Sequence, residues 1–398
     1  MKFFKKKLRN GITVIMEKRD VPVVSVCIAN RFGAAYEESK VKGIAHLIEH
    51  LVFTGTKERS HEDISREIEK KGGILNAFTA NEATAFWFKL PSEHVFSGLD
   101  IIVDIMKNPT FSDKRFEKEK RVILEEIKMY HDDPGRKVHE LIVENLYEEP
   151  FGEGIIGNPG TINALKRDFV ANYFKKHYSP ENYIAVIVGN ADFDLICTYL
   201  EKNFEKEKKK LREIKIKKKN GQSVEKRGGI DQAHYIFAVH SPLIEDKNYY
   251  ALEVLDSYLA NGMSSRLFLR IREERGLAYT VHSSINAEKN YSYYSIYAGT
   301  MKEAIPEIQS IILEEFEKIK NLGERELEEA KERLIGLRKV SSEESSRVMA
   351  ELIYAEMTEG SEEYYKHEEK IRAVKLEDVK KLAREMIKKY STAAIVPK

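Results

Sequence analysis

The stretch His46-Leu47-Ile48-Glu49-His50 places two histidines four residues apart, with a glutamate directly before the second. On a helix, side chains at positions i and i+4 share one face, so both imidazoles can bind the same tetrahedral zinc ion. Glu49 occupies the mirror-image position of the glutamate in the His-Glu-x-x-His zinc motif, which favours a role as general base rather than as a third ligand. A pair of core histidines satisfied by hydrogen bonds would give the same short pattern. A catalytic zinc site therefore requires a further ligand downstream.

The segment from Asp113 to Asp132 is where such a ligand is expected. It reads as a long helix in which Glu119 and Glu126, seven residues apart, fall within the apolar face, whereas Glu117 and Glu125 point toward solvent. A carboxylate that faces the core is costly unless it is paired or bound to metal. One of the two buried carboxylates can therefore be a ligand, and the other can orient a ligand histidine. The apolar residues that define the face are Phe116, Val122, Ile123, Ile127 and Tyr130.

These residues resemble the pattern of the inverted-motif zinc peptidases, the family of mitochondrial processing peptidases, insulin-degrading enzymes and pitrilysin. Glu126 follows His50 by 76 residues, which is the spacing at which the family carries its ligand glutamate. The resemblance implies that Glu126 is the third zinc ligand and that Glu119 is the additional buried acidic residue seven positions earlier. It also implies that this chain is a half-length member of the bacterial or archaeal type.

Two further segments carry the resemblance along nearly the whole chain. Residues 72–86, which contain Asn76, Ala77 and Phe78, resemble the family's edge strand, along which a substrate peptide adds as an extra strand. Residues 264–279 resemble the segment whose arginine and tyrosine contact the substrate near the scissile carbonyl. The resemblance assigns these contacts to Arg272 and Tyr279, a cation and a phenol of the kind that stabilises a developing oxyanion.

Size and composition restrict the classes of protein to consider. At 398 residues with 42% hydrophobic residues, the chain is long enough for two domains. The net charge of +1 gives no support to nucleic acid as a partner. Cys27 and Cys197 lie in apolar runs and read as buried thiols, which favours a reducing, cytoplasmic location. The start of the chain resembles a strand and a hairpin turn rather than a signal peptide, and there is no apolar run of about 18 residues, so we expect no membrane partner. The abundance of Lys and Glu favours a thermophilic source.

An internal repeat indicates two related domains. Residues 164–170 begin a helix that leads to the strand 184–188, and residues 373–379 begin a similar helix that leads to the strand 392–396. We expect an α+β fold in which each of two homologous domains is a mostly antiparallel sheet covered by helices on one face.

The expected boundaries place a zinc-binding domain at 1–204 and a charged linker at 205–229. The linker is rich in lysine and ends in two glycines, and its interleaved glutamates favour a solvated connection over a site for an acidic partner. Residues 230–398 would form the related domain, which contains no metal motif and contributes the arginine and tyrosine.

Other motifs have simpler interpretations. Residues 152–157 spell G-x-G-x-x-G, but they follow a helical segment, and Asn158-Pro159-Gly160 is a poor opening for the helix that a dinucleotide site needs. The polar run His131 to Pro134 is typical of a helix end. Residues 60–63 resemble a capping box, which leaves His61 exposed in a first helical turn.

The sequence thus predicts a zinc-dependent metalloendopeptidase that hydrolyses peptides or unfolded segments. His46, His50 and Glu126 would hold zinc, and Glu49 would act as general base. By resemblance, half-length members pair, so we expect a homodimer that encloses a chamber, with Arg272 and Tyr279 reaching the partner's zinc. A non-catalytic subunit, or one half of a peptidase heterodimer, is the alternative.

Overall fold

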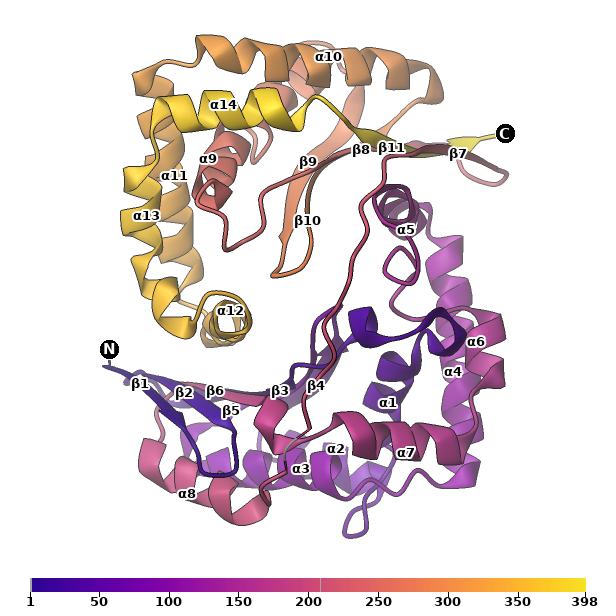
Figure 1. The fold of residues 1–398 in the computed structure, drawn as a ribbon, viewed down its shortest axis with the longest axis vertical. Coiled ribbons are helices and arrows are strands. Elements are labelled where there is room, and N and C mark those ends of the chain that lie inside the picture. The colour runs from indigo at the N-terminus through magenta and orange to yellow at the C-terminus, as the bar shows by residue number, and fades with distance from the viewer. Residues whose placement is uncertain (1, 208) are drawn as a thin grey trace. The chain divides into compact units, whose positions relative to one another are not determined.

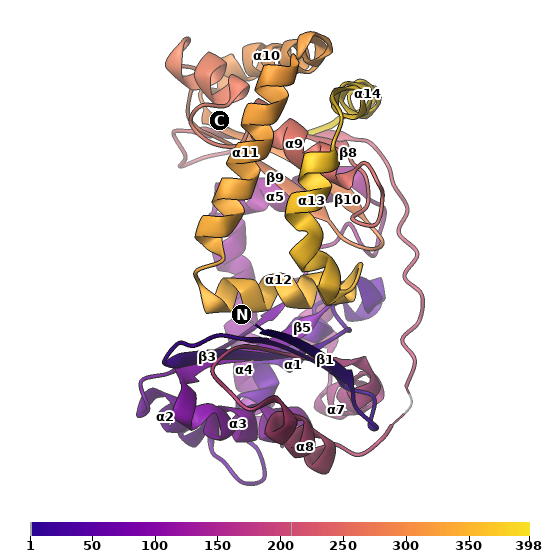
Figure 2. The same ribbon diagram turned by 90° about the vertical axis from the view of Figure 1, so that its left-hand side faces the viewer.

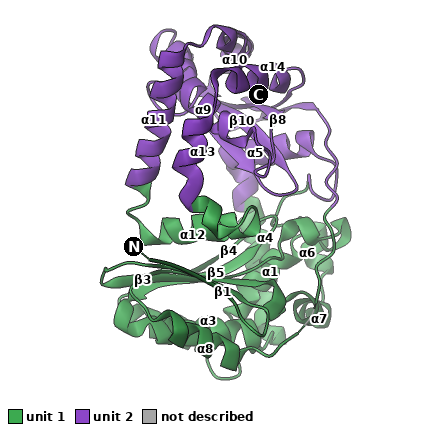
Figure 3. Ribbon diagram, turned by 60° about the vertical axis from the view of Figure 1, so that its left-hand side comes forward, with its two compact units in different colours: residues 1–128, 153–214, 341–364 green, residues 129–152, 215–340, 365–398 purple. Residues whose placement is uncertain are grey.

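The computed structural model describes residues 2–207 and 209–398, which form two compact units (Figure 3). Unit 1 contains the described residues of Met1–Lys128, Glu153–Ile214 and Ser341–Tyr364. Unit 2 contains Met129–Gly152, Lys215–Val340 and Tyr365–Lys398. The division differs from the expected boundaries because each unit includes a segment from the other half of the sequence.

A six-stranded sheet forms the centre of unit 1 (Figures 1 and 2). The pair β2 and β6 is parallel, and the other neighbours are antiparallel. Strand β4 lies at one edge, where it pairs with β5 alone. The strands, in spatial order, are β1 (Lys2–Lys7), β2 (Thr13–Lys18), β6 (Tyr183–Gly189), β3 (Val23–Asn30), β5 (Thr84–Pro91) and β4 (Ile74–Thr79).

A five-stranded sheet forms the centre of unit 2. The pair β7 and β11 is parallel, and the other neighbours are antiparallel. Strand β7 lies inside the stretch 205–229 that we expected to be a linker, because its backbone pairs with β11. Residue 208 of that stretch lies outside the described residues. The strands, in spatial order, are β7 (Gln222–Arg227), β11 (Ser391–Pro397), β8 (Ala233–His240), β10 (Ser292–Thr300) and β9 (Ala278–Ala287).

The two sheets share one topology, which confirms the two related sheet-plus-helix halves. The sequence β2-β6-β3-β5-β4 corresponds, strand by strand and direction by direction, to β7-β11-β8-β10-β9. Helix α7 (Arg167–His177) leads to β6, and α14 (Leu376–Met386) leads to β11, at the positions where the repeat was found. Strand β1 is present in unit 1 alone among the described residues.

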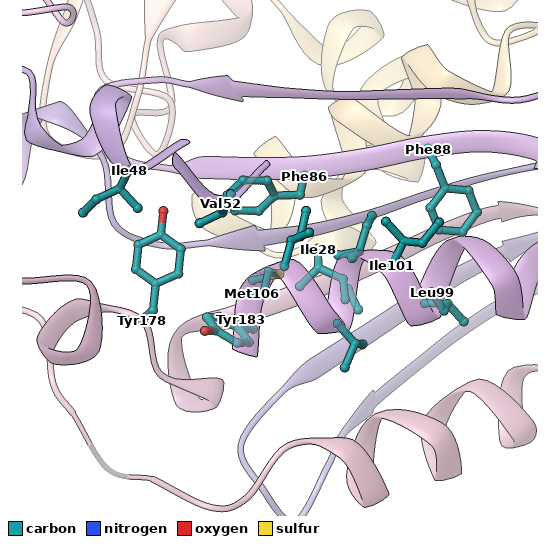
Figure 4. Packing of buried hydrophobic residues seen from close by; sticks show 14 of the residues in the cluster. Ile28, Ile48, Val52, Phe86, Phe88, Leu99, Ile101, Met106, Tyr178 and Tyr183 are labelled. Carbon is teal, nitrogen blue, oxygen red and sulfur yellow. The ribbon is translucent and has the colours of Figure 1, made fainter. Parts of the chain in front are cut away.

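The main core of unit 1 lies between its sheet and a layer of helices. Ile48 and Val52 of α1, Phe86 of β5 and Met106 of α3 are buried members of this core (Figure 4). The helices of unit 1 are α1 (Ile44–Val52), α2 (His61–Glu69), α3 (Val95–Lys107), most of α4 (Asp113–Asp132), α6 (Pro159–Ala164), α7, α8 (Phe193–Asn203) and α12 (Ser345–Met357).

Unit 2 has a corresponding core, in which Tyr235 and Phe237 of β8 and Ile296 of β10 pack against helices. Its helices are α5 (Pro134–Leu146), α9 (Tyr249–Leu259), α10 (Ile305–Lys318), α11 (Glu324–Ser341), α13 (His367–Ala373) and α14, with the short π-helix η5 (Phe268–Glu273). Short 3-10 turns complete the two units: η1 (Ala34–Tyr36), η2 (Ser39–Val41), η3 (Ser92–His94), η4 (Pro180–Asn182), η6 (Lys302–Ala304), η7 (Ile319–Asn321) and η8 (Ser361–Lys366).

Each sheet also carries one helix on its second face, which the sequence analysis did not predict. In unit 1, α12 lies across β3 and β6 on the side opposite α3 and α8 (Figures 1 and 2), and the hydroxyls of Ser25 and Ser345 lie 2.9 Å apart there. In unit 2, α5 packs against β11 and β8. Strands with both faces covered are buried at nearly every residue, as β3 and β6 are.

The two cysteines and the starts of α2 and α6 bear on smaller predictions from the sequence. Cys27 and Cys197 are free and buried, as predicted. The capping box of Ser60 and Asp63 is present at the start of α2. The expectation for Asn158-Pro159-Gly160 is wrong: α6 begins at Pro159 because proline is tolerated in a first helical turn and the Asn158 side chain caps the helix. No helix of the described chain has the length and apolar character needed to cross a membrane.

Candidate metal centre

Helix α1 carries the two histidines, and its start is tightly constrained. Gly43 precedes it with a φ of +91°, and a Cβ atom there would lie 2.6 Å from the carbonyl oxygen of Ile156. The glycine-rich stretch 152–157 therefore packs against the beginning of this helix. The buried Glu37 carboxylate accepts hydrogen bonds from the backbone N–H groups of Gly43 and Ala45, at 3.0 and 2.7 Å. A carboxylate at a helix N-terminus satisfies free donors and opposes the helix dipole, so this contact fixes the helix.

Three candidate ligand side chains converge inside unit 1. The structure brings one ligand atom each from His46, His50 and Glu126 within 4.8 Å of one another. The Nε2 atoms of His46 and His50 lie 3.8 and 3.6 Å from the same Glu126 oxygen, Oε2. Among the residues that the structure describes, this is the single group of three such side chains with this spacing.

Glu126 and Glu119 reach the histidines from α4. The Glu119 carboxylate lies 3.5 Å from Nδ1 of His50, on the opposite side of the ring from Glu126. Both glutamates are partly buried, as expected, whereas Val122 is 40% exposed and does not belong to the buried face. Val122 lies at the margin of the apolar stripe, which explains why it was wrongly assigned to the buried face. Lys120 is buried instead, where its ammonium group donates to the carbonyl oxygens of Asn163 and Leu165.

The residues present fit a zinc ion. Two imidazoles and one carboxylate are a common donor set for catalytic zinc, which leaves a fourth position open. Burial lowers the pKa of His46 to about 3, with a further contribution from His50, so this ring is neutral and able to act as a ligand. Burial also lowers the pKa of His50, but the carboxylates of Glu119, Glu49 and Glu126 outweigh it and raise the pKa. The Nε2 atoms of both histidines lie beyond hydrogen-bond distance of the Glu126 oxygen, so the three candidate ligands are close together without being hydrogen-bonded to one another.

Glu49 lies on the same helix and is held by the edge strand. The Thr79 hydroxyl, at the end of β4, donates a hydrogen bond of 2.5 Å to Oε2 of Glu49. Burial raises the pKa of Glu49 and the Glu126 charge adds to this, whereas Thr79 and His50 oppose it. The hydrogen bond orients the Glu49 carboxylate, which interacts electrostatically with His50 and Glu126.

The three predicted substrate-strand residues lie on β4, the edge strand of the unit 1 sheet. Asn76 and Phe78 are exposed and Ala77 is half-buried, in the alternation expected of an edge strand. The Asn76 side-chain oxygen accepts a hydrogen bond of 2.8 Å from the Ala77 N–H. A free edge offers backbone groups to an added peptide strand.

Arg272 and Tyr279 belong to unit 2, whereas the three candidate ligands belong to unit 1. The Arg272 guanidinium lies 4.8 Å from the ring centre of Phe268 and 5.0 Å from that of Tyr279. The Tyr279 side chain is 77% exposed at the start of β9. The two predicted helpers are therefore adjacent to each other, in a cation–π contact.

Sequence reasoning missed two features of this region. Thr79 was not singled out, because nothing in the local pattern indicates the partner of a single hydroxyl. A cavity of about 510 Å³ also adjoins the site, with His61, Ser65 and Glu69 of α2 in its wall. The four-residue spacing of these three residues places them on one helix face, and this spacing was the sequence signal that could have indicated a shared surface.

Comparisons with known proteins agree on one family. The model described as "Insulinase (Peptidase family M16)" matches residues 13–159, and the model "Peptidase M16 inactive domain" matches residues 164–334. A Bacillus subtilis protein named an uncharacterized zinc protease is 30% identical over 98% of this chain and 97% of its own length. A Rickettsia felis protein with the same description is 31% identical over 82% of this chain and 81% of its own length.

Two solved structures share the fold. A protease from Helicobacter pylori has a TM-score of 0.91 at 21% identity and covers 100% of this chain and 99% of that one. A peptidase M16 inactive domain from Pseudomonas fluorescens has a TM-score of 0.89 at 17% identity, with coverage of 100% and 98%. At these identities the likeness concerns the fold.

Proposed function

Because this chain belongs to the insulinase family, peptidase family M16, we propose that it is a zinc-dependent endopeptidase that cleaves peptides or unfolded segments. One observation carries the proposal: ligand atoms of His46, His50 and Glu126 lie within 4.8 Å of one another, next to Glu49. Such a donor set, with a general base beside it, is the minimum that metal-assisted hydrolysis requires.

The proposed roles follow from these contacts. His46, His50 and Glu126 hold the metal, and a bound zinc ion supplies Lewis acidity to the scissile carbonyl and to the attacking water. Glu49 takes the proton of that water and later delivers it to the leaving amine. Thr79 fixes the Glu49 carboxylate through its hydrogen bond. Glu119 orients the His50 ring from the side of Nδ1.

The substrate is proposed to bind as an extended strand along β4. Its main chain would pair with the free edge beside Asn76, Ala77 and Phe78, so binding would depend on backbone more than on sequence. Arg272 and Tyr279 are proposed to stabilise the developing oxyanion from a second copy of the chain, in a homodimer that encloses the substrate. A closed chamber would exclude folded proteins and admit flexible ones.

Location and source are part of the proposal. The free, buried state of Cys27 and Cys197 supports a reducing compartment, and we place the protein in the cytoplasm. The Lys- and Glu-rich composition supports a thermophilic source, and a melting temperature in the range of mesophilic proteins would argue against it.

A peptide library digested with and without chelator, and read by mass spectrometry, tests the activity. We expect chelator-sensitive internal cleavage by the native chain. The Glu49→Gln variant should retain zinc but lose about 100- to 10,000-fold in kcat, the range typical of a general base. The matched control is Glu125→Gln, because Glu125 is exposed on α4 beside Glu126. Substantial turnover by Glu49→Gln would remove Glu49 from the mechanism.

A mixing experiment tests the shared site. Glu49→Gln and Tyr279→Phe chains, each impaired alone, should regain activity after subunit exchange if one copy supplies the base and the other the phenol. Confirmed exchange without recovery would show that each chain is self-sufficient.

The second candidate is a non-catalytic or partner-dependent subunit of a peptidase heterodimer. The observation that favours it is that residues 164–334 match the family model of a peptidase M16 inactive domain. That match lies outside the proposed metal centre. The second half of the chain contains no copy of the His-x-x-Glu-His motif. Zinc content together with chelator-sensitive cleavage distinguishes the two candidates.

A further inference from the structure

Strand β7 forms one edge of the unit 2 sheet, where it pairs with β11 alone (Figure 1). The Arg227 carbonyl, at the end of β7, accepts a hydrogen bond of 3.1 Å from the N–H of Lys398. Every second residue of a strand directs its backbone groups to the same neighbour, so Gln222, Val224 and Lys226 direct theirs away from β11. A row of outward N–H and C=O groups is a template for a further strand.

The corresponding strand of unit 1, β2, shows how such an edge is covered. Val14 of β2 pairs with Ala185, and Val224 of β7 pairs with Ala394. Both alanines belong to the cores of their units, so the two valines occupy corresponding positions on the face of the sheet that carries the core. Val14 is 0% exposed, whereas Val224 is 68% exposed.

Strand β1 accounts for much of this difference. It pairs with β2 along its whole length, and its Phe4 packs against the core of unit 1. The Phe4 ring also stacks on Phe193 of α8, with 5.3 Å between the ring centres. Strand β7 has no such neighbour in the described part of the chain. The unit 2 sheet therefore presents an open strand edge beside an exposed valine, at the place that β1 fills in unit 1.

The charges at this edge are mainly positive. Lys218 and Lys219 are exposed directly before β7, and Lys226 is exposed on it. None of these three lysines forms an ion pair with another described residue. The one acidic residue of β7, Glu225, accepts hydrogen bonds of 3.0 and 2.6 Å from the Arg227 guanidinium. An added strand that carries acidic side chains would therefore meet cations without a partner.

The same lysines disfavour a second copy of this chain as the added strand. If two β7 strands paired in antiparallel fashion about Val224, Lys218 and Lys219 of one copy would lie near the Lys226 end of the other. Like charges at such a short distance repel, and lysines on an edge strand are a common means of preventing self-association. The charge pattern thus favours a different, acidic chain.

We propose that the open edge of β7 is a docking site for an extended acidic segment of a partner protein. The main chain of this segment pairs with the outward backbone groups of Gln222, Val224 and Lys226, as β1 pairs with β2 in unit 1. An apolar side chain of the segment covers Val224, and acidic side chains beside it pair with the lysines. The site lies within unit 2 and does not depend on the proposed peptidase function.

The test uses a fluorescein-labelled octapeptide in which two glutamates stand on each side of a central Thr-Val-Val-Thr. Its binding to the full chain is measured by fluorescence anisotropy in the presence of chelator, so that peptidase activity does not remove it. The acidic peptide should bind at least about tenfold more tightly than its analogue with lysine in place of glutamate. Methylation of alternate backbone nitrogens should abolish binding, because strand pairing needs those N–H groups.

Two variants separate the backbone from the charge. Val224→Pro removes an outward N–H but no hydrogen bond to β11, a change that edge strands tolerate, and binding should fall at least about tenfold. Lys226→Glu should weaken binding of the acidic peptide about fivefold and strengthen that of the lysine analogue. The matched control is Lys302→Glu, which makes the same change of charge in η6, after β10, and should leave binding unchanged.

Hydrogen exchange identifies the strand that the peptide occupies. Protection of the β7 amides by the acidic peptide supports the proposal, whereas protection confined to β1, β4 or β9, the other edge strands, overturns it. Equal binding of the two peptides, or binding that both variants leave intact, also overturns it. A smaller oligomer of Val224→Pro than of the native chain in light scattering would show that a second copy occupies this edge, and would overturn it as well.

Discussion

Helices α1 and α9 follow corresponding strands of the two units, β3 and β8, yet they bury polar groups in opposite ways. In unit 2, α9 buries Asp256, whose carboxylate accepts hydrogen bonds from Ser283, Tyr294 and Asn261. Burial raises the pKa of Asp256, and these neutral donors counteract the shift. The group is satisfied by its own unit and is a structural element.

In unit 1, α1 carries the buried His46 and the half-buried His50, whose Nε2 atoms face Glu126 without a hydrogen bond to it. The Nε2 atoms of two histidines face a carboxylate oxygen at distances longer than a hydrogen bond, and Nδ1 of His46 has no partner. The same scaffold thus carries one polar site that neutral donors complete and one that a cation can complete. For these two helices, the difference is that neutral donors of its own unit satisfy the Asp256 carboxylate, whereas the His46 and His50 rings face Glu126 at a spacing that a metal ion could fill.

The sharpest way to break this comparison is to remove the carboxylate ligand from unit 1. Glu126→Gln keeps the shape of the side chain but removes the charge that balances the metal. We expect bound zinc to be lost and kcat/KM to fall at least about 1,000-fold, which corresponds to roughly 4 kcal/mol of transition-state stabilisation. Metal analysis and peptide cleavage measure both effects. Glu125→Gln should change neither, and retention of zinc by Glu126→Gln would exclude Glu126 as a ligand.

The reciprocal experiment removes the satisfied carboxylate from unit 2. Asp256→Ala leaves buried hydroxyl and amide donors without an acceptor, and we expect a loss of about 2 to 3 kcal/mol of stability. Faster hydrogen exchange in β9 and β10 would report it. Zinc content should not change, in contrast to Glu126→Gln. Asp231→Ala is the control, because Asp231 is exposed in the connection before β8. Zinc loss in Asp256→Ala would contradict the division into structural and functional sites.

Some of this arrangement could be predicted from the sequence because it follows local rules. The four-residue spacing of the histidines and the seven-residue spacing of Glu119 and Glu126 each define one helix face. The repeat predicted two related sheets, and the shared strand order agrees with it. Val122 was assigned wrongly because periodicity does not show where a buried face ends.

Other features depend on contacts between distant segments. The placement of α5 and α12 on the second faces of the sheets could not be read from either helix, since both have ordinary amphipathic patterns. The continuous apolar run of β6 did contain the signal that two faces are covered. The partner of Thr79 lies 30 residues earlier in the chain, so no spacing rule could identify it.

Thr79 offers a smaller and more specific perturbation of unit 1. Thr79→Val is nearly isosteric and keeps a β-branched residue in the strand, but it removes the hydroxyl that holds Glu49. We expect kcat to fall about tenfold with KM and zinc content unchanged, because one hydrogen bond to a charged group is lost. Thr79→Ser restores the hydroxyl and should restore most of kcat. An equal loss in both variants would show that the strand, rather than the hydroxyl, matters.

The smallest expected effect is a loss of stability of unit 2 in acid. His139 of α5, His234 of β8 and His282 of β9 surround Tyr297, whose hydroxyl lies 2.7 Å from Nδ1 of His234. Burial lowers the pKa of all three histidines below the ordinary value of 6.5. His282 lowers the pKa of His139 further, and for His234 the nearby Asp133 and Arg227 act in opposite directions.

The sign of the pH effect follows from these shifts. The folded unit binds protons more weakly than the unfolded chain, so the stability that neutral imidazoles provide is present above pH 6.5 and is lost as the pH falls below it. Hydrogen exchange in α5 and β9, corrected for its intrinsic pH dependence, should therefore accelerate between pH 7 and pH 5. His282→Gln removes one titrating ring and should flatten this dependence, whereas His94→Gln, a substitution in unit 1, should not. If the native chain, His282→Gln and His94→Gln all respond to acid alike, carboxylates elsewhere control the acid sensitivity, and the histidines around Tyr297 are ordinary packing residues.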